Sequence, residues 1–263
     1  MSAIVATNVQ KTYGSGADAV AAVRGVDLDV ADGQIFGFLG PNGAGKTTTV
    51  RMLTTLMTLT AGTAQVAGVD VTADPHGARR KIGVALQEAG LDSRQTGREL
   101  LTLQSRLFGM SKTTAAARAN ELLALVELEE AADRRVKGYS GGMKRRLDLA
   151  SALVHRPEVL FLDEPTTGLD PASRLTVWDE VRRINRLGTT VFLTTQYLEE
   201  ADQLCDRLAI IDEGRVVLEG TPTSLKQQLR DHKGLSHEPT LDDVFLEATG
   251  RTRERSAGDV KEI

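Results

Sequence analysis

The chain has 263 residues, of which 41% are hydrophobic and 26% are charged, and this composition excludes a wholly disordered protein. The length is enough for one large α/β domain, or for one domain with a small appendage. The formal net charge of −4 argues against a general nucleic-acid binder, which would usually be basic, so no nucleic acid is expected among the partners.

Short strands are predicted in the first third of the chain. Residues 26–30 alternate apolar side chains with aspartates, which is the period of a half-exposed antiparallel strand. Residues 34–39 (QIFGFL) form an apolar run that predicts a buried strand leading into a glycine-rich loop. A helix is expected from Lys46, where this loop ends, and further strands are predicted at residues 63–67 and 82–86.

The pattern becomes helical between about residues 96 and 154, and no strand is predicted there. Thr96 and Glu99 stand at the spacing of a capping box, which opens a helix through Phe108. Two more helices are expected in this stretch, at residues 115–128 and 143–154. We therefore predict a helical subdomain, inserted at about residues 88–155.

Strands and helices alternate again after this stretch. Asp170 is expected to cap a helix that has Pro171 at its first position and ends at Gly188. The other expected elements are strands at residues 158–162, 190–193, 208–211 and 215–218, and a helix at residues 198–204. Such alternation predicts an α/β fold in which helices wrap a mostly parallel sheet. The main domain is expected at residues 1–220, followed by a short helical extension at residues 221–263.

A phosphate-binding loop is predicted where the strand at residues 34–39 meets the next helix. The pattern G-x-x-x-x-G-K-[ST] is matched by Gly40, Pro41, Asn42, Gly43, Ala44, Gly45, Lys46 and Thr47. Glycines let backbone N–H groups curl around a phosphate, and the helix N-terminus adds positive charge. Lys46 is expected to reach the β- and γ-phosphates and Thr47 to ligate Mg²⁺, with Thr48 as a further nucleotide-binding residue. The alternative is a glycine-rich turn that contains a lysine by chance.

An acidic pair follows the apolar strand at residues 159–162. Asp163 is carried to the edge of the sheet where open α/β sheets bind their ligands, and there it can hold the Mg²⁺ shell. Glu164 points to the other side of the chain and could polarise the attacking water as a general base. An acidic turn after a strand is the alternative for both residues, and the phosphate loop weakens it. The two motifs together predict hydrolysis of a nucleoside triphosphate.

The sequence YSGGM resembles the signature motif of the ATP-binding cassette (ABC) ATPases, usually LSGGQ, with Tyr139 and Met143 in place of leucine and glutamine. It also lies upstream of the acidic pair, as in that family. The resemblance implies that Ser140, Gly141 and Gly142 close on the γ-phosphate of ATP held by a second protomer. It therefore implies a head-to-tail homodimer in the ATP-bound state, with two composite sites.

Three other positions match motifs of the same family, and a fourth departs from one. The resemblance implies that Tyr13 stacks on adenine, with an ordinary strand aromatic as the alternative. Gln87 matches the glutamine that contacts the metal and water and senses the membrane partner. Asp170 lies in a segment, GLD, that resembles the loop crossing the dimer interface. Gln196 stands where the family has its switch histidine, and its amide can donate a hydrogen bond to the γ-phosphate but cannot carry a charge.

Three segments resemble the branch of daunorubicin-resistance-type drug-export ATPases. They are YSGGM, TTQYLEEAD (residues 194–202) and LDDVFLEATG (residues 241–250). The C-terminal appendage is shorter here than in that branch, which leaves its role open. The resemblance implies an ATP-hydrolysing subunit that powers export of a small hydrophobic compound, often a drug or antibiotic, through a separate polytopic permease. Contact with the permease is expected near Gln87, Glu88 and Leu91.

Other functions remain as alternatives. One is an importer ATPase, and another is a nucleotide-sensing regulatory subunit with little turnover because of Gln196. Chromosome-type cassettes are split by a long coiled coil and ribosome-type relatives carry two cassettes, and neither pattern is present. There is no secretory signal and no apolar run near the roughly 18 residues of a membrane helix, so a peripheral place on the cytoplasmic face of the membrane is expected. Cys205 is expected to be a small packed hydrophobe, with a reactive thiol as the alternative.

Overall fold

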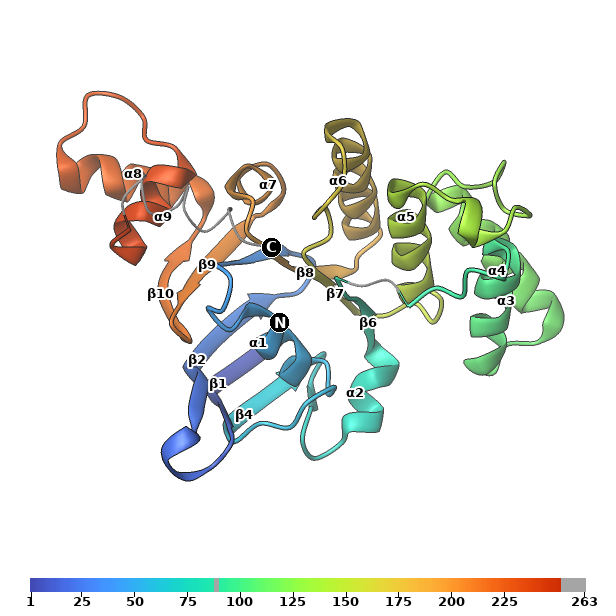
Figure 1. Cartoon of the computed structure of the whole chain (residues 1–263), viewed down its shortest axis with the longest axis horizontal. Coiled ribbons are helices and arrows are strands. Elements are labelled where there is room, and N and C mark those ends of the chain that lie inside the picture. The colour runs from blue at the N-terminus through green and yellow to red at the C-terminus, as the bar shows by residue number, and fades with distance from the viewer. Residues whose placement is uncertain (88–89, 252–263) are drawn as a thin grey trace.

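The fold is organised around two β-sheets, and the computed structural model describes residues 1–87 and 90–251 (Figure 1). The larger sheet has six strands in the order β10-β9-β3-β8-β7-β6. Its strands are β3 (Ile35–Leu39), β6 (Ile82–Ala85), β7 (Val159–Asp163), β8 (Thr190–Thr195), β9 (Arg207–Asp212) and β10 (Arg215–Gly220). All neighbours pair in parallel except β9 and β10, which are antiparallel. The prediction of a mostly parallel sheet is confirmed.

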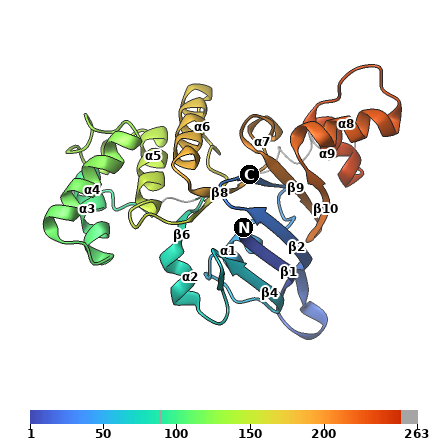
Figure 2. The same cartoon turned by 180° about the vertical axis from the view of Figure 1, so that it is seen from behind.

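The smaller sheet is antiparallel and has four strands in the order β2-β1-β4-β5. Its strands are β1 (Ser2–Tyr13), β2 (Val20–Ala31), β4 (Ala61–Val66) and β5 (Val69–Asp70), and a 3-10 turn at Gly16–Asp18 joins the first two. The predicted alternation in β2 is confirmed, because Val26, Leu28 and Val30 are buried while Asp27 and Asp29 are exposed. Figures 1 and 2 place helix α1 (Lys46–Leu53) between the two sheets.

Each face of the six-stranded sheet has its own core, as a parallel sheet buried on both sides requires. Phe36, Phe38 and Phe161 face α1, each with its ring centroid 5.4–5.6 Å from that of Phe192. Helices α6 (Pro171–Arg186) and α7 (Leu198–Leu204) cover the opposite face (Figure 1). Cys205 is buried in this second core, which confirms its prediction as a packed hydrophobe, and burial raises the pKa of its thiol. Burial on both faces fixes the register of the strands and therefore the position of their ends.

The predicted helical stretch is confirmed and lies beyond α6, at one side of the molecule (Figure 1). Its helices are α3 (Gly97–Leu107), α4 (Lys112–Leu125) and α5 (Gly141–Ala152), with a 3-10 turn at Val136–Gly138 before α5. Thr96 and Glu99 form the expected capping box at α3. Helix α4 starts three residues earlier than predicted, because the Ser111 side chain accepts a hydrogen bond from the N–H of Thr114.

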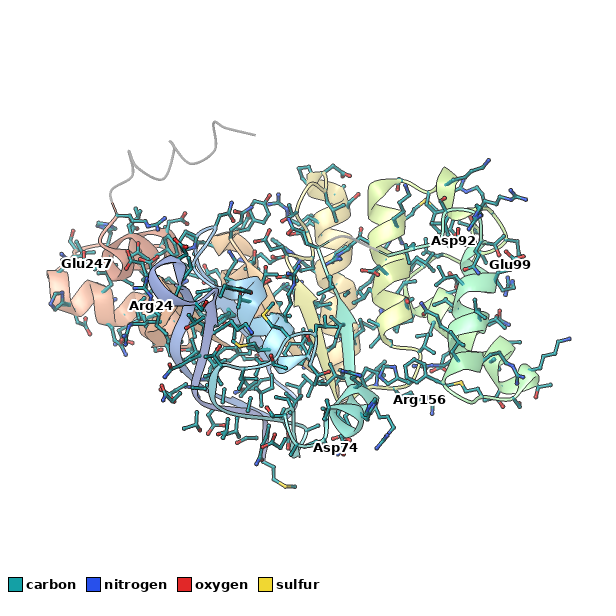
Figure 3. All side chains as sticks on the ribbon, turned by 60° about the horizontal axis from the view of Figure 1, so that its bottom comes forward. Arg24, Asp74, Asp92, Glu99, Arg156 and Glu247 are labelled. Atoms are coloured by element: carbon teal, nitrogen blue, oxygen red, sulfur yellow. The ribbon has the colours of Figure 1, made fainter. Side chains whose placement is uncertain are left out.

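Helix α2 (Pro75–Lys81) was not expected from the sequence. Its short, basic segment lacks the apolar periodicity that predicts a helix. The Asp74 side chain nevertheless caps it by accepting a 2.7 Å hydrogen bond from the N–H of Gly77, and Pro75 occupies its first position. Figure 3 shows Asp74 beside this helix and Glu99 in the helical stretch.

The C-terminal segment forms helices α8 (Pro222–Lys233) and α9 (Leu241–Thr249), which are capped by the side chains of Thr221 and Thr240. Leu225, Leu241 and Val244 are buried in the same core as α6 and α7. The boundary between a main domain at residues 1–220 and an extension at residues 221–263 stays a prediction, and its last twelve residues lie outside the described part. No helix within residues 1–87 and 90–251 combines the length and the apolar character needed to cross a bilayer.

Candidate functional site

The predicted site residues follow the carboxyl ends of adjacent parallel strands. Leu39 of β3 pairs with Thr195 of β8, and Asp163 of β7 pairs with Thr194 of β8. Strand β6 lies on the other side of β7 and ends in the same direction. The structure therefore brings the phosphate loop, the acidic pair, residue 196 and residue 87 to one edge of the sheet, where open α/β sheets bind ligands.

The phosphate loop (residues 40–47) needs glycine at two positions for different reasons. A Cβ atom on Gly40 would lie 2.3 Å from the backbone carbonyl oxygen of Ile211, so no side chain fits there. Gly45 caps helix α1 in the left-handed conformation, with φ of +106°, which other residues rarely adopt. The loop therefore brings backbone and helix N-terminus close together, as anion binding requires.

Lys46 is buried at the first position of α1, with 4% of its surface exposed. Its ammonium donates hydrogen bonds to the carbonyl oxygens of Gly40 (2.8 Å) and Pro41 (3.2 Å), and lies 3.4 Å from Oε1 of Glu164. Burial lowers the pKa of Lys46, and the nearby charge of Glu164 opposes this shift. A cationic group and a carboxylate therefore meet at the base of the loop.

Asp163 and Thr47 form a pair of oxygen donors beside the loop. Oδ1 of Asp163 accepts hydrogen bonds from the hydroxyls of Thr194 (2.5 Å) and Thr47 (3.3 Å). Hydroxyl and carboxylate oxygens suit Mg²⁺, which usually takes one or two protein ligands together with phosphate oxygens and water. The described residues contain no cluster of three or more His, Cys, Asp or Glu side chains able to hold a metal.

The backbone of Glu164 is in the left-handed region, with φ of +48°, an unusual conformation for a residue with a side chain. Its N–H donates to both the carbonyl oxygen (3.1 Å) and the hydroxyl (3.0 Å) of Thr194. The Thr167 hydroxyl donates to Oε2 of Glu164 at 3.3 Å. Strained residues of this kind persist where their surroundings hold them, and they cluster at active sites.

Tyr13 lies beside the helix that follows the phosphate loop. Its hydroxyl lies 3.4 Å from that of Thr48 and donates to Sδ of Met57 at 3.1 Å. The side chain is 39% exposed, and the ammonium of Lys11 lies 5.6 Å from the ring centroid. The structure thus places the aromatic side chain near the loop with part of its surface open for stacking.

The signature residues lie apart from the phosphate loop. Ser140 caps helix α5 and its Oγ accepts a hydrogen bond from the N–H of Met143, while Gly142 packs against Ser173 of α6. Ser140 and Gly141 are exposed. Within residues 1–87 and 90–251, no hydrogen bond joins residues 140–142 to the phosphate loop. This chain alone therefore does not bring the two motifs together.

The remaining predicted residues are at the surface near these motifs. Asp170 caps α6, and two hydrogen bonds from Ser173 hold the pKa of its carboxyl below the usual range. Gln87 and Gln196 are exposed directly beyond β6 and β8, and neither side chain forms a hydrogen bond with the described residues. Leu91 is partly buried against the core, and Glu88 lies outside the described residues.

Sequence reasoning missed Thr194, Arg145 and Thr167, which all contact the acidic pair. Thr194 anchors both acidic residues, but it lies in an apolar strand and resembles any strand residue. Arg145 of α5 donates a hydrogen bond to the carbonyl oxygen of Asp163. Its position one turn after Gly141, on the side of α5 that faces the sheet, is the only signal the sequence offers.

The family model described as ABC transporter matches residues 23–167, which is more than half of the sequence. The chain belongs to the ABC transporter family. Daunorubicin/doxorubicin resistance ATP-binding protein DrrA of Streptomyces peucetius is 56% identical over 208 residues, which cover 79% of this chain and 63% of that protein. The chain thus spans less than two thirds of that relative. Nod factor export ATP-binding protein I of Burkholderia orbicola is 48% identical, with coverage of 83% and 70%.

Solved structures of the family have the same fold. The dimeric ATP-binding cassette MJ0796, in a post-hydrolysis state bound to ADP and Pi, superposes with a TM-score of 0.75 and 28% identity, covering 83% of this chain and 98% of that chain. A structure described as the ATP-binding subunit of an ABC transporter gives a TM-score of 0.78 with 26% identity, covering 93% and 98%. The predicted cassette fold, with its antiparallel subdomain and helical insertion, is confirmed.

Proposed function

We propose that this chain is the ATP-hydrolysing subunit of an ABC exporter that drives a small hydrophobic compound, such as a drug or antibiotic, through a separate membrane permease. The observation that carries the proposal is the grouping of Lys46, Asp163 and Glu164 at one sheet edge. The names of two sequence relatives, a daunorubicin/doxorubicin resistance ATP-binding protein and a Nod factor export ATP-binding protein, support export. The subunit works at the cytoplasmic face of the membrane as a peripheral protein.

The phosphate loop and its lysine bind ATP in this proposal. Backbone N–H groups of residues 40–47 surround the phosphates, and Lys46 carries the main side-chain charge facing them. Tyr13 stacks on the adenine ring. Thr47, Asp163 and Gln87 hold Mg²⁺, which supplies positive charge against the phosphate oxygens when it is bound.

Glu164 activates the attacking water in this proposal. Its carboxylate lies 3.4 Å from the ammonium of Lys46, so a phosphate group that binds Lys46 competes for this contact. Once Lys46 turns to the phosphates, Glu164 becomes available to accept a proton from water. Gln196 donates its amide N–H to the γ-phosphate from the end of β8.

The site is completed by a second copy of the chain. Ser140, Gly141 and Gly142 lie at the N-terminus of α5, where the first two are exposed, and such a helix start is suited to bind a phosphate presented from outside the chain. In the ATP-bound homodimer each signature motif contacts the γ-phosphate held by the other protomer. Asp170 lies at the same interface: it is exposed at the start of α6 and bonds to Ser173, which packs against Gly142.

Hydrolysis by the purified chain tests the enzymatic part. Glu164→Gln keeps the shape of the side chain but removes the base, so we expect ATP binding to be retained while hydrolysis slows by about 10²-fold. Steady-state phosphate release and equilibrium binding of ATP measure the two quantities separately. Hydrolysis at the wild-type rate by Glu164→Gln would show that another group activates the water.

A low-turnover, nucleotide-sensing subunit is the second candidate, and Gln196 is the observation that favours it. A glutamine cannot carry the proton or the charge that a switch histidine can. Wild-type turnover decides between the two: rapid hydrolysis supports the motor, and tight ATP binding with almost no phosphate release supports the sensor. An importer ATPase would hydrolyse ATP equally well, and only the direction of transport by the reconstituted complex separates it from an exporter.

The permease is expected to bind near Gln87 and Leu91, where the sheet meets the helical stretch. Asp92, exposed beside these residues (Figure 3), offers a position for a cysteine cross-linker, and Val20 on the small sheet is an exposed control. Cys205 is buried and should not compete. We expect Asp92→Cys, and not Val20→Cys, to cross-link to a copurified polytopic membrane protein. The opposite preference would contradict this docking position.

A further inference from the structure

Arg145 of α5 is a buried arginine with 8% of its surface exposed, and no motif assigns it a role. Its guanidinium donates to three backbone carbonyl oxygens that belong to two separate segments of the sheet edge. They are those of Leu86 (2.6 Å from Nη1), Asp163 (3.2 Å from Nη2) and Pro165 (2.9 Å from Nε). Asp148, one turn further along α5, accepts a fourth bond at 3.2 Å and balances the charge.

Two of these bonds go to the residues on either side of Glu164 in the sequence. They hold the carbonyl groups of the residues before and after it, Asp163 and Pro165. Glu164 itself has the strained φ of +48°, and on its other side its N–H is bonded to Thr194. A strained conformation is kept only where several contacts determine it together. Thr194 thus holds the backbone N–H of Glu164, and Arg145 holds the carbonyl groups of the two residues beside it.

The third bond reaches the other functional strand end. Leu86 directly precedes Gln87, which we place at the metal and at the permease contact. A planar guanidinium presents five donors in a rigid fork, so it can contact separate carbonyl groups in fixed relative positions, which a lysine ammonium on a flexible stem cannot. One side chain therefore joins the signature helix to the segments that carry Gln87 and Glu164.

We propose that Arg145 is a positioning residue that ties the signature helix α5 to Glu164 and Gln87, so that a movement of α5 moves both residues. This inference rests on the proposed function, in which Glu164 activates water and α5 closes on the partner protomer. It adds a route by which dimer closure or permease contact changes the hydrolytic geometry. Arg145 itself does not touch the nucleotide.

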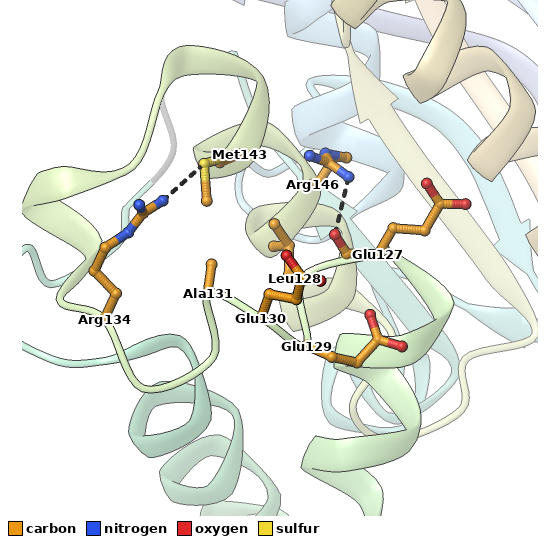
Figure 4. Close-up of a pocket in the computed structure, with 8 residues that line it drawn as sticks. All are labelled: Glu127, Leu128, Glu129, Glu130, Ala131, Arg134, Met143 and Arg146. Carbon is orange, nitrogen blue, oxygen red and sulfur yellow. Dashed lines mark hydrogen bonds between the residues drawn. The ribbon is translucent and has the colours of Figure 1, made fainter.

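Arg146, the next residue along α5, offers a matched control (Figure 4). Its guanidinium donates to the carbonyl oxygens of Val126 (3.0 Å) and Glu127 (3.3 Å), which belong to the helical stretch. It reaches neither Leu86 nor the residues around Glu164. Arg145→Met and Arg146→Met therefore remove the same group from the same helix, and only the first releases the sheet edge.

The experiment compares the two variants in the full chain. For Arg145→Met we expect kcat for ATP hydrolysis to fall by about 10- to 100-fold, the effect of a misplaced reacting group, while KM changes by less than about threefold because the phosphate loop is untouched. Hydrogen–deuterium exchange at residues 86–87 and 163–168 should become faster. Arg146→Met should keep both quantities near wild type.

Two further variants separate positioning from folding. Arg145→Met/Asp148→Asn removes the carboxylate that the single variant leaves without its partner, and it should show the same loss of kcat. Arg145→Lys should give an intermediate kcat, because it restores the charge but not the fork. Equal kcat and equal exchange in Arg145→Met and Arg146→Met would overturn the proposal.

Failure of the proposed function gives a different result. If wild type and Glu164→Gln hydrolyse ATP at the same rate, Glu164 is not the base. The exchange comparison still decides whether Arg145 holds the two segments, because it needs only the folded chain. Faster exchange at residues 163–168 in Arg145→Met alone supports the tie, and unchanged exchange there rejects it.

Discussion

The phosphate-loop side and the signature side of the proposed site are completed to different degrees within one chain. On the first side, buried Lys46 contacts Gly40 and Glu164, and Thr47 contacts Asp163. On the second side, Ser140 and Gly141 are exposed, and among the described residues Ser140 bonds only within its own helical turn. This difference agrees with the proposed homodimer, in which each chain contributes one half of a catalytic site to the other.

The largest expected effect comes from breaking the phosphate side. Lys46→Ala removes the main side-chain charge facing the phosphates and leaves Glu164 buried without its cation. We expect it to abolish ATP binding or hydrolysis, measured by equilibrium binding and phosphate release. Lys112 is the matched control, because it is also the first residue of a helix but is exposed on α4. Near wild-type hydrolysis in Lys46→Ala would rule out the phosphate-loop assignment.

A smaller effect on hydrolysis is expected from substitution of Gln196, which directly follows strand β8. Gln196→Ala should lower kcat several-fold to about a hundred-fold and leave ATP affinity nearly unchanged, since one hydrogen bond to a charged group contributes roughly 1.5–3 kcal/mol and acts here in the closed state. Gln196→His should be tolerated, because a neutral imidazole can also present one N–H. Comparison of kcat with the ATP dissociation constant checks this. If Gln196→Ala turns over like wild type, the switch lies elsewhere.

The smallest expected effect concerns stability beneath the signature side. Glu180 of α6 has 1% of its surface exposed, neither carboxylate oxygen forms a hydrogen bond with the described residues, and Arg146 lies 3.9 Å away. Burial raises the pKa of Glu180 to about 8, against the attraction of Arg146, so desolvation outweighs this long ion pair. The pKa of Glu180 is near 4.5 in the unfolded chain and about 8 in the folded one. The stability that comes from keeping this carboxyl protonated is therefore fully present below pH 4.5, and it is lost as the pH rises through 8.

Replacement of this carboxyl should therefore remove a pH dependence. Between pH 6 and pH 9 wild type should lose about 2–3 kcal/mol of unfolding free energy that Glu180→Gln does not lose. Thermal unfolding across this range measures it. Asp179→Asn is the control, because Asp179 is exposed on the same helix and raises the pKa of Glu180 less than the other groups around it, so most of the dependence should remain. Parallel pH curves for wild type and Glu180→Gln would contradict a neutral Glu180.

Motif spacing could predict the phosphate side because its parts are contiguous with their strands. The loop from Gly40 to Thr47 joins a strand to a helix, and Asp163 is the last residue of the apolar strand β7. Local sequence therefore determines where the loop and Asp163 lie. Helix α2 was missed, although Asp74 followed by Pro75 is a helix-start signal that could have found it.

Other features depend on partners far along the chain. Arg145 bonds to carbonyl groups at residues 86, 163 and 165, and a backbone carbonyl leaves no trace in the sequence. The left-handed φ of Glu164 is held by contacts with Thr194 on another strand and with Arg145 on α5, so no local residue preference indicates it. The buried Glu180 resembles any charged residue of an amphipathic helix until its neighbours are known.

The mass of the Glu164→Gln variant in solution with ATP tests the composite site most directly. Slow hydrolysis should trap the ATP-bound form, and size-exclusion chromatography with light scattering should then give the mass of two chains. Glu164→Gln/Ser140→Arg should bind ATP through its intact phosphate loop and yet remain at the mass of one chain, because the large side chain blocks the signature. A single-chain mass for Glu164→Gln saturated with ATP, or an equal dimer in both variants, would contradict a site shared between two chains.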